Sequence, residues 1–143
     1  MIYLFAFFLI SVLVFLFSLY QNFSQHRQFT ETPFLSWLGI FVWGDAVIFA
    51  PFWMISSLLC LTAKNLNLFL FITSLFWVVR SLGETIYWFN QQFSTLNRNP
   101  PERLFGYRFI KNDSIWFIYQ NFWQCLTVIS ILFSVLLINK INI

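Results

Sequence analysis

Residues 66–91 read LNLFLFITSLFWVVRSLGETIYWFNQ. The run exceeds the length of about 20 predominantly apolar residues that a helix needs to cross a bilayer. Its charged residues are Arg80 and Glu84, which lie one helical turn apart near the middle of the run. The apolar length predicts a transmembrane helix, and the two charges indicate where a functional site should be sought.

Three further apolar runs have the same character, at about residues 3–20, 35–61 and 115–138. Thr32 and Pro33 precede the second of them, and they suit an N-cap and the first helical position. The N-terminal run lacks a basic leader and a small-residue cleavage site, so we expect a retained helix rather than a signal peptide. The sequence therefore predicts an all-α, polytopic integral membrane protein, built as a single domain from a bundle of four transmembrane helices.

The composition supports a lipid environment. Of the 143 residues, 59% are hydrophobic and 9% are charged, with 21 phenylalanines and 7 tryptophans, whereas about a quarter of a soluble domain is charged. The net charge is +3 without a basic stripe, so no nucleic-acid partner is predicted. One histidine and two cysteines outside any CxxC pair give no basis for predicting a metal site or a cofactor.

The polar connections at about residues 21–33 and 92–114 predict the topology. With four spans, both lie on one side, and the basic residues are divided five to two between that side (Arg27, Arg98, Arg103, Arg108, Lys111) and the other (Lys64, Lys140). This excess predicts that the long loops are cytoplasmic and the termini outside, in a plasma, inner or organellar membrane.

The loop at residues 92–114 also interleaves basic and aromatic residues. Such a pattern is typical of segments that lie among lipid headgroups, so anionic headgroups are a predicted partner of its four basic residues, Arg98, Arg103, Arg108 and Lys111. The alternative is a loop whose charges serve only to set the topology.

Polar residues of three predicted spans fall in one layer. On a helical wheel the polar side chains of residues 66–91 form one stripe, and the fourth span carries a broader one. Counting about 1.5 Å per residue from each midpoint places five polar residues roughly 2–10 Å toward the long-loop side: Asp45 of the second span, Arg80, Glu84, Gln120 and Gln124. We therefore predict a shared site for ligand or ion binding, formed by Asp45, Arg80, Glu84, Tyr87, Gln91, Gln120 and Gln124.

Charges at this depth must be compensated. A charge at the bilayer centre costs about 2.5–3.5 kcal/mol, so Arg80 is expected to pair with Glu84, and Asp45 offers a second carboxylate. The formal sum of the three charges is −1, which calls for a bound proton or cation.

Two functions fit this pattern. The first is ion- or proton-linked transport or binding of a small solute, in a homo-oligomer or with a partner membrane subunit, because one four-helix protomer seldom encloses a pore. The second is a non-catalytic accessory or scaffold subunit of a larger membrane complex, since buried ion pairs also hold helices in register. An enzyme is disfavoured, because nothing else in a catalytic constellation accompanies the carboxylates.

Overall fold

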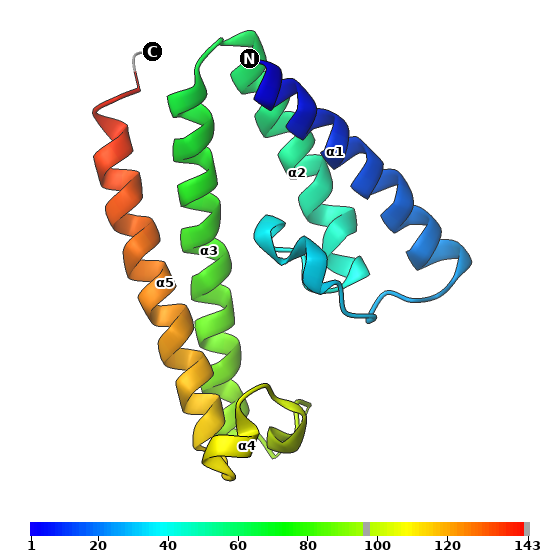
Figure 1. Ribbon diagram of the computed structural model, residues 1–143, viewed down its shortest axis with the longest axis vertical. Coiled ribbons are helices and arrows are strands. Elements are labelled where there is room, and N and C mark those ends of the chain that lie inside the picture. Colours follow the sequence, from blue (N-terminus) through cyan, green and yellow to red (C-terminus); the bar gives the residue numbers. More distant parts are fainter. Residues whose placement is uncertain (96–97, 142–143) are drawn as a thin grey trace. The chain divides into compact units, whose positions relative to one another are not determined.

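The computed structural model describes residues 1–95 and 98–141 as an all-α chain with four long helices. These helices are α1 (Ile2–Leu19), α2 (Trp43–Thr62), α3 (Leu66–Phe93) and α5 (Ser114–Ile138), as Figure 1 shows. Short helical turns lie in the connections: η1 (Tyr20–Ser24), η2 (Pro33–Leu38), η3 (Pro101–Arg103) and α4 (Tyr107–Ile110). The predicted all-α class with four membrane-length helices is confirmed.

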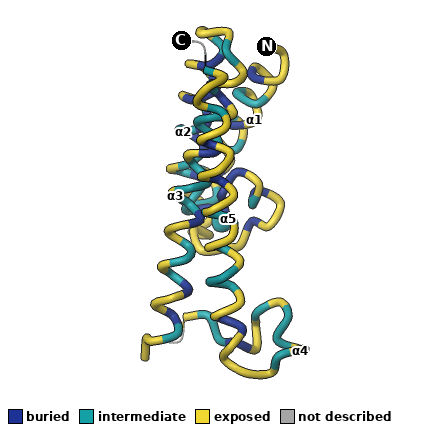
Figure 2. Tube along the Cα trace, turned by 90° about the vertical axis from the view of Figure 1, so that its left-hand side faces the viewer, coloured by how far each residue is buried: buried dark blue, intermediate teal, exposed yellow. Residues whose placement is uncertain are grey.

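Each of the four helices, the first extended by η1, is long and apolar enough to cross a membrane. Exposed residues recur along all four (Figure 2), and many of them are large and apolar. So much exposed apolar surface is unfavourable in water, whereas contact with lipid chains carries no such penalty. The helices thus indicate a membrane-embedded protein.

The chain forms two compact units, and each has its own packing. The first unit is Met1–Ile72 with the C-terminal residues from Lys140, and the second is Thr73–Asn139. In the first unit, α1 packs against α2. The buried positions of α1 recur every seven residues (Leu4, Ser11, Ser18). Apart from Ser56, those of α2 alternate three- and four-residue steps (Trp43, Ala46, Ala50, Trp53, Ser57, Cys60). This is the spacing of a left-handed helix pair, and the small residues allow close approach.

The start of the second span differs from the prediction. Helix α2 begins at Trp43 rather than at residue 35, because the chain first makes the 3₁₀ turn η2 and then reverses. Gly39 ends that turn with φ of 73°, a left-handed conformation that favours glycine. The Thr32 N–H then donates to the Phe41 carbonyl at 2.7 Å, next to an isolated β-bridge between Glu31 and Val42. Thr32 and Pro33 thus open the short turn instead of the span.

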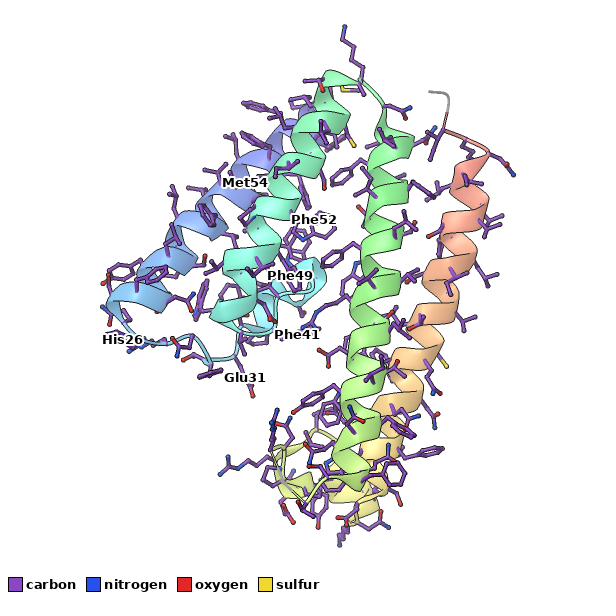
Figure 3. The ribbon with its side chains drawn as sticks, turned by 180° about the vertical axis from the view of Figure 1, so that it is seen from behind. His26, Glu31, Phe41, Phe49, Phe52 and Met54 are labelled. Carbon is purple, nitrogen blue, oxygen red and sulfur yellow. The ribbon has the colours of Figure 1, made fainter. Side chains whose placement is uncertain are left out.

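Residues 28–42 fold back alongside α2 and form what we call the re-entrant segment. Figure 1 shows it in cyan beside α2, and Figure 3 shows His26 and Glu31 at the loop end of the same unit. The Trp53 indole N–H donates to the Leu38 carbonyl at 3.0 Å. Trp53 is roughly 15 Å along α2 from its first residue, so the tip of the segment reaches that depth. Its inward side chains are buried: Thr32, Leu35, Leu38 and Ile40.

Candidate functional site

The second unit is organised by the antiparallel pairing of α3 with α5 (Figure 1). Within the described part of the chain, side-chain hydrogen bonds join the helices at three levels. Ser134 Oγ donates to Ser74 Oγ at 2.9 Å, Thr127 Oγ1 donates to Ser81 Oγ at 2.9 Å, and Gln92 Nε2 donates to Gln120 Oε1 at 2.6 Å. We call these three bonds the polar ladder. Its positions on α5 recur every seven residues, which is the period of a left-handed coiled coil.

The predicted pair of charges forms on α3. An Arg80 guanidinium nitrogen lies 2.9 Å from Glu84 Oε1, and the two side chains are 17% and 16% exposed. The four-residue spacing places both groups on one face of the helix. Arg80 lies at the middle of α3 (Leu66–Phe93), and Glu84 lies one turn closer to the connection that precedes α5. The centre of a membrane-length helix therefore carries an ion pair.

Tyr87 lies almost one further turn along α3 and is tied to the connection that follows the helix. Its hydroxyl accepts a hydrogen bond from Asn99 Nδ2, and the Asn99 carbonyl accepts one from the Trp116 indole at 3.0 Å. The Tyr87 ring also stands edge-on to Trp88, with ring centroids 5.3 Å apart. These contacts fix the tyrosine at the loop end of the helix pair.

The three predicted glutamines have different surroundings. Gln91 is buried, and Gln120 is bonded to Gln92 as part of the polar ladder. Gln124 is exposed, which differs from the inward stripe that the sequence predicts for α5. The bonds of the ladder on α5 are made by Gln120 and by Thr127, one turn further along the helix from Gln124. The assignment of the glutamines to a ligand site stays a prediction.

Asp45 lies in the first turn of α2, nearer the helix end than the sequence predicts. Its Oδ2 accepts a hydrogen bond from the Phe41 N–H at 3.0 Å, so the carboxylate satisfies a backbone donor just before the helix starts. A negative charge is also favourable at a helix N-terminus. Asp45 belongs to the first unit and the ion pair to the second. Its grouping with Arg80 and Glu84 stays a prediction.

Sequence reasoning overlooked four polar residues that organise the second unit: Ser74, Ser81, Gln92 and Asn99. Ser74, Ser81 and Trp88 are buried and lie seven residues apart on α3. That interval is visible in the sequence, but an uncharged serine is a weaker sign of an internal site than a charged residue. The heptad spacing, rather than the polarity, is the signal that could have located the pairing face.

Comparisons with protein-family models, with curated proteins and with solved structures find no match. The function is therefore inferred from the chemistry of the site. A guanidinium offers five N–H donors to an anion, while a carboxylate accepts a cation or a proton. The pair therefore presents groups that can bind an anion, a cation or a proton.

Proposed function

We propose that the protein binds a small charged or protonatable solute at Arg80 and Glu84 within the membrane, and that it moves this solute in an ion- or proton-linked step. The observation that carries the proposal is the Arg80–Glu84 pair at the centre of a membrane-length helix. Ionisable groups are costly at that position, and where they occur they usually mark ligand or ion pathways.

The placement of the pair favours a functional role over a purely structural one. Both charges of the described ion pair belong to α3, so this contact does not itself join two helices. The neutral polar ladder already joins α3 to α5 through hydroxyl and amide groups. Neutral groups thus already bond the two helices to each other, whereas two charges are costly at this depth.

The alternative is a non-catalytic accessory or scaffold subunit, and one observation favours it. An Arg–Glu pair at 2.9 Å is internally neutral, so it can reside within a membrane protein without any ligand. In either case the excess of basic residues in the long loops supports cytoplasmic loops and outside termini, and we propose assembly as a homo-oligomer or with a partner membrane subunit.

The test is ion flux into liposomes that contain the purified protein. Internal pyranine reports protons under a potassium diffusion potential, and Na⁺, K⁺ and chloride are probed separately with ion-sensitive dyes. We expect flux of at least one probe above that of empty liposomes, and a loss of at least tenfold in Arg80→Gln and in Glu84→Gln. The matched controls are Arg27→Gln and Glu31→Gln, which alter an exposed arginine and glutamate at the same spacing.

Two results would overturn the transport proposal. Flux no greater than that of empty liposomes for every probe, from protein that is monodisperse by gel filtration, would favour the accessory subunit. An equal loss in the Arg27→Gln and Glu31→Gln controls would show that surface charge, rather than the ion pair, controls the flux.

A further inference from the structure

Residues 98–113 form a folded cap at one end of α3 and α5, and we call them the basic cap. They contain η3 and α4, and the segment turns at Gly106 and at Lys111, both of which have positive φ. Its inward side chains, Leu104, Tyr107 and Ile110, pack against a buried cluster of Trp88, Ile115 and Trp116. The spacing of three residues puts these side chains on one side of the cap.

Two hydrogen bonds donated by aromatic side chains of α5 help to hold the cap to that helix. The Trp116 indole donates to the Asn99 carbonyl at 3.0 Å, and the Tyr119 hydroxyl donates to the Phe105 carbonyl at 3.3 Å. The backbone on either side of η3 is therefore fixed to the helix. A segment held in this way presents its outward side chains from a defined position.

The outward face combines phenyl rings with cations. Phe105 and Phe109 are 92% and 90% exposed, and the neighbouring Arg103, Arg108 and Lys111 are exposed too. Residues 98–113 carry four basic and two acidic residues, a net charge of +2. Two exposed rings are unfavourable in water, while the cations would be unfavourable in the hydrocarbon core. The headgroup region, between those two environments, accommodates both.

We propose that the basic cap binds the headgroups of anionic lipids, with Phe105 and Phe109 inserted at the interface and Arg103, Arg108 and Lys111 on lipid phosphates. The cap lies where two membrane-length helices end, at Phe93 and Ser114, which is the level of the headgroups. Each basic residue near an anionic surface strengthens binding by about fivefold. The loop thereby serves as a lipid-recognition site in addition to setting the topology.

The test measures lipid preference in mixed micelles of detergent and phosphatidylcholine. Energy transfer from the tryptophans to a dansyl phosphatidylglycerol reports binding, and displacement by unlabelled phosphatidylglycerol or phosphatidylcholine gives relative binding constants. We expect the wild type to prefer phosphatidylglycerol. The triple variant Arg103→Gln/Arg108→Gln/Lys111→Gln should lose at least tenfold of that preference. The control triple variant Arg27→Gln/Lys64→Gln/Lys140→Gln removes the same charge elsewhere and should keep it.

Further measurements distinguish a lipid phosphate from a soluble phosphate and test the role of the two phenyl rings. Glycerol 1-phosphate should not displace the dansyl lipid. The double variant Phe105→Ser/Phe109→Ser should weaken the binding of both lipids without changing the ratio of their binding constants. In the wild type, raising the salt concentration should reduce the preference, because exposed charges are screened. Equal losses in the two triple variants, a salt-insensitive preference, or displacement by glycerol 1-phosphate would each overturn the proposal.

Discussion

The Trp53 indole N–H donates to the Leu38 carbonyl at 3.0 Å, and both residues are almost fully buried. This bond joins the middle of α2 to the tip of the re-entrant segment, where the backbone leaves the 3₁₀ turn. Backbone that is not helical occurs at membrane depth only where protein or water satisfies its polar groups. The indole supplies such a partner to a carbonyl that has left the helical pattern.

Removing this donor should loosen the re-entrant segment. Trp53→Phe keeps a ring beside Phe7, whose centroid is 5.6 Å away, but leaves the buried Leu38 carbonyl without the indole. We expect a loss of about 1–3 kcal/mol in the free energy of unfolding in detergent, as is typical when a buried acceptor loses its donor.

Trp37→Phe is the matched control for that prediction. The Trp37 indole also donates to a carbonyl of the same segment, that of Phe34 at 3.0 Å, but Trp37 is exposed. Its replacement should change the free energy of unfolding by about 0.5 kcal/mol or less. Equal losses in the two variants would show that the buried bond at Trp53 has no special role.

Cysteine labelling should locate the tip of the re-entrant segment within the membrane. In a Cys60→Ala/Cys125→Ser background, we expect Gln28→Cys to react with a membrane-impermeant maleimide and Ser36→Cys to be protected. The reason is that Ser36 lies in η2, next to the tip that Trp53 contacts, whereas Gln28 is exposed at the start of the segment. A helix over residues 35–61 would instead place Ser36 at the membrane surface. Equal labelling rates would favour that continuous helix.

The long helices could be predicted from the sequence, and the re-entrant segment could not. Apolar length alone identifies a membrane helix because lipid favours any long apolar run, so three spans agree closely with α1, α3 and α5. The run at 35–61 is predominantly apolar, yet its first residues form the end of the 3₁₀ turn η2 and a reversal of the chain before α2 begins. Leu35, Leu38 and Ile40 are buried there. Hydropathy does not distinguish a membrane helix from an apolar segment that is partly buried within the protein. The left-handed φ of Gly39 and the hydrogen bond of Trp53 show that residues 35–42 are the second kind.

The candidate site was predictable to the extent that it depends on one helix. Arg80 and Glu84 pair as their spacing requires, because positions four residues apart are neighbours on any α-helix. Interactions between helices depend on rotation about each axis, which polarity alone does not determine. Gln120 therefore bonds with Gln92, which the predicted site omits, and Gln124 is exposed.

The polar ladder should contribute small, pairwise energies. A double-mutant cycle of Ser74→Ala and Ser134→Ala should give a coupling of about 0.6 kcal/mol, the average for hydrogen bonds between membrane helices. The control cycle pairs Ser74→Ala with Thr127→Ala, two residues on different bonds of the ladder, and should be additive. Unfolding in mixed micelles with increasing SDS measures both cycles. A coupling of zero in the first cycle would mean that the Ser74–Ser134 contact adds nothing to stability.

The ion pair should behave as a coupled unit, in which the loss of one charge destabilises the other. Arg80→Gln leaves the Glu84 carboxylate without this cation at the middle of α3, and Glu84→Gln leaves the guanidinium without this anion. Breaking a buried pair typically costs about 3–5 kcal/mol. Because both side chains retain some exposure, we expect about 2–3 kcal/mol for each single variant.

The double variant Arg80→Gln/Glu84→Gln should recover part of that loss, since two amides at this spacing can hydrogen-bond without any uncompensated charge. Unfolding in detergent for the wild type, both single variants and the double variant gives the coupling energy directly. We expect the double variant to be more stable than either single variant, because it leaves no uncompensated charge. It should nevertheless be inactive in the liposome assay, because binding of the solute requires the charged groups. Additive losses would show that Arg80 and Glu84 act independently. A double variant that is both stable and fully active would remove the ion pair from the proposed function.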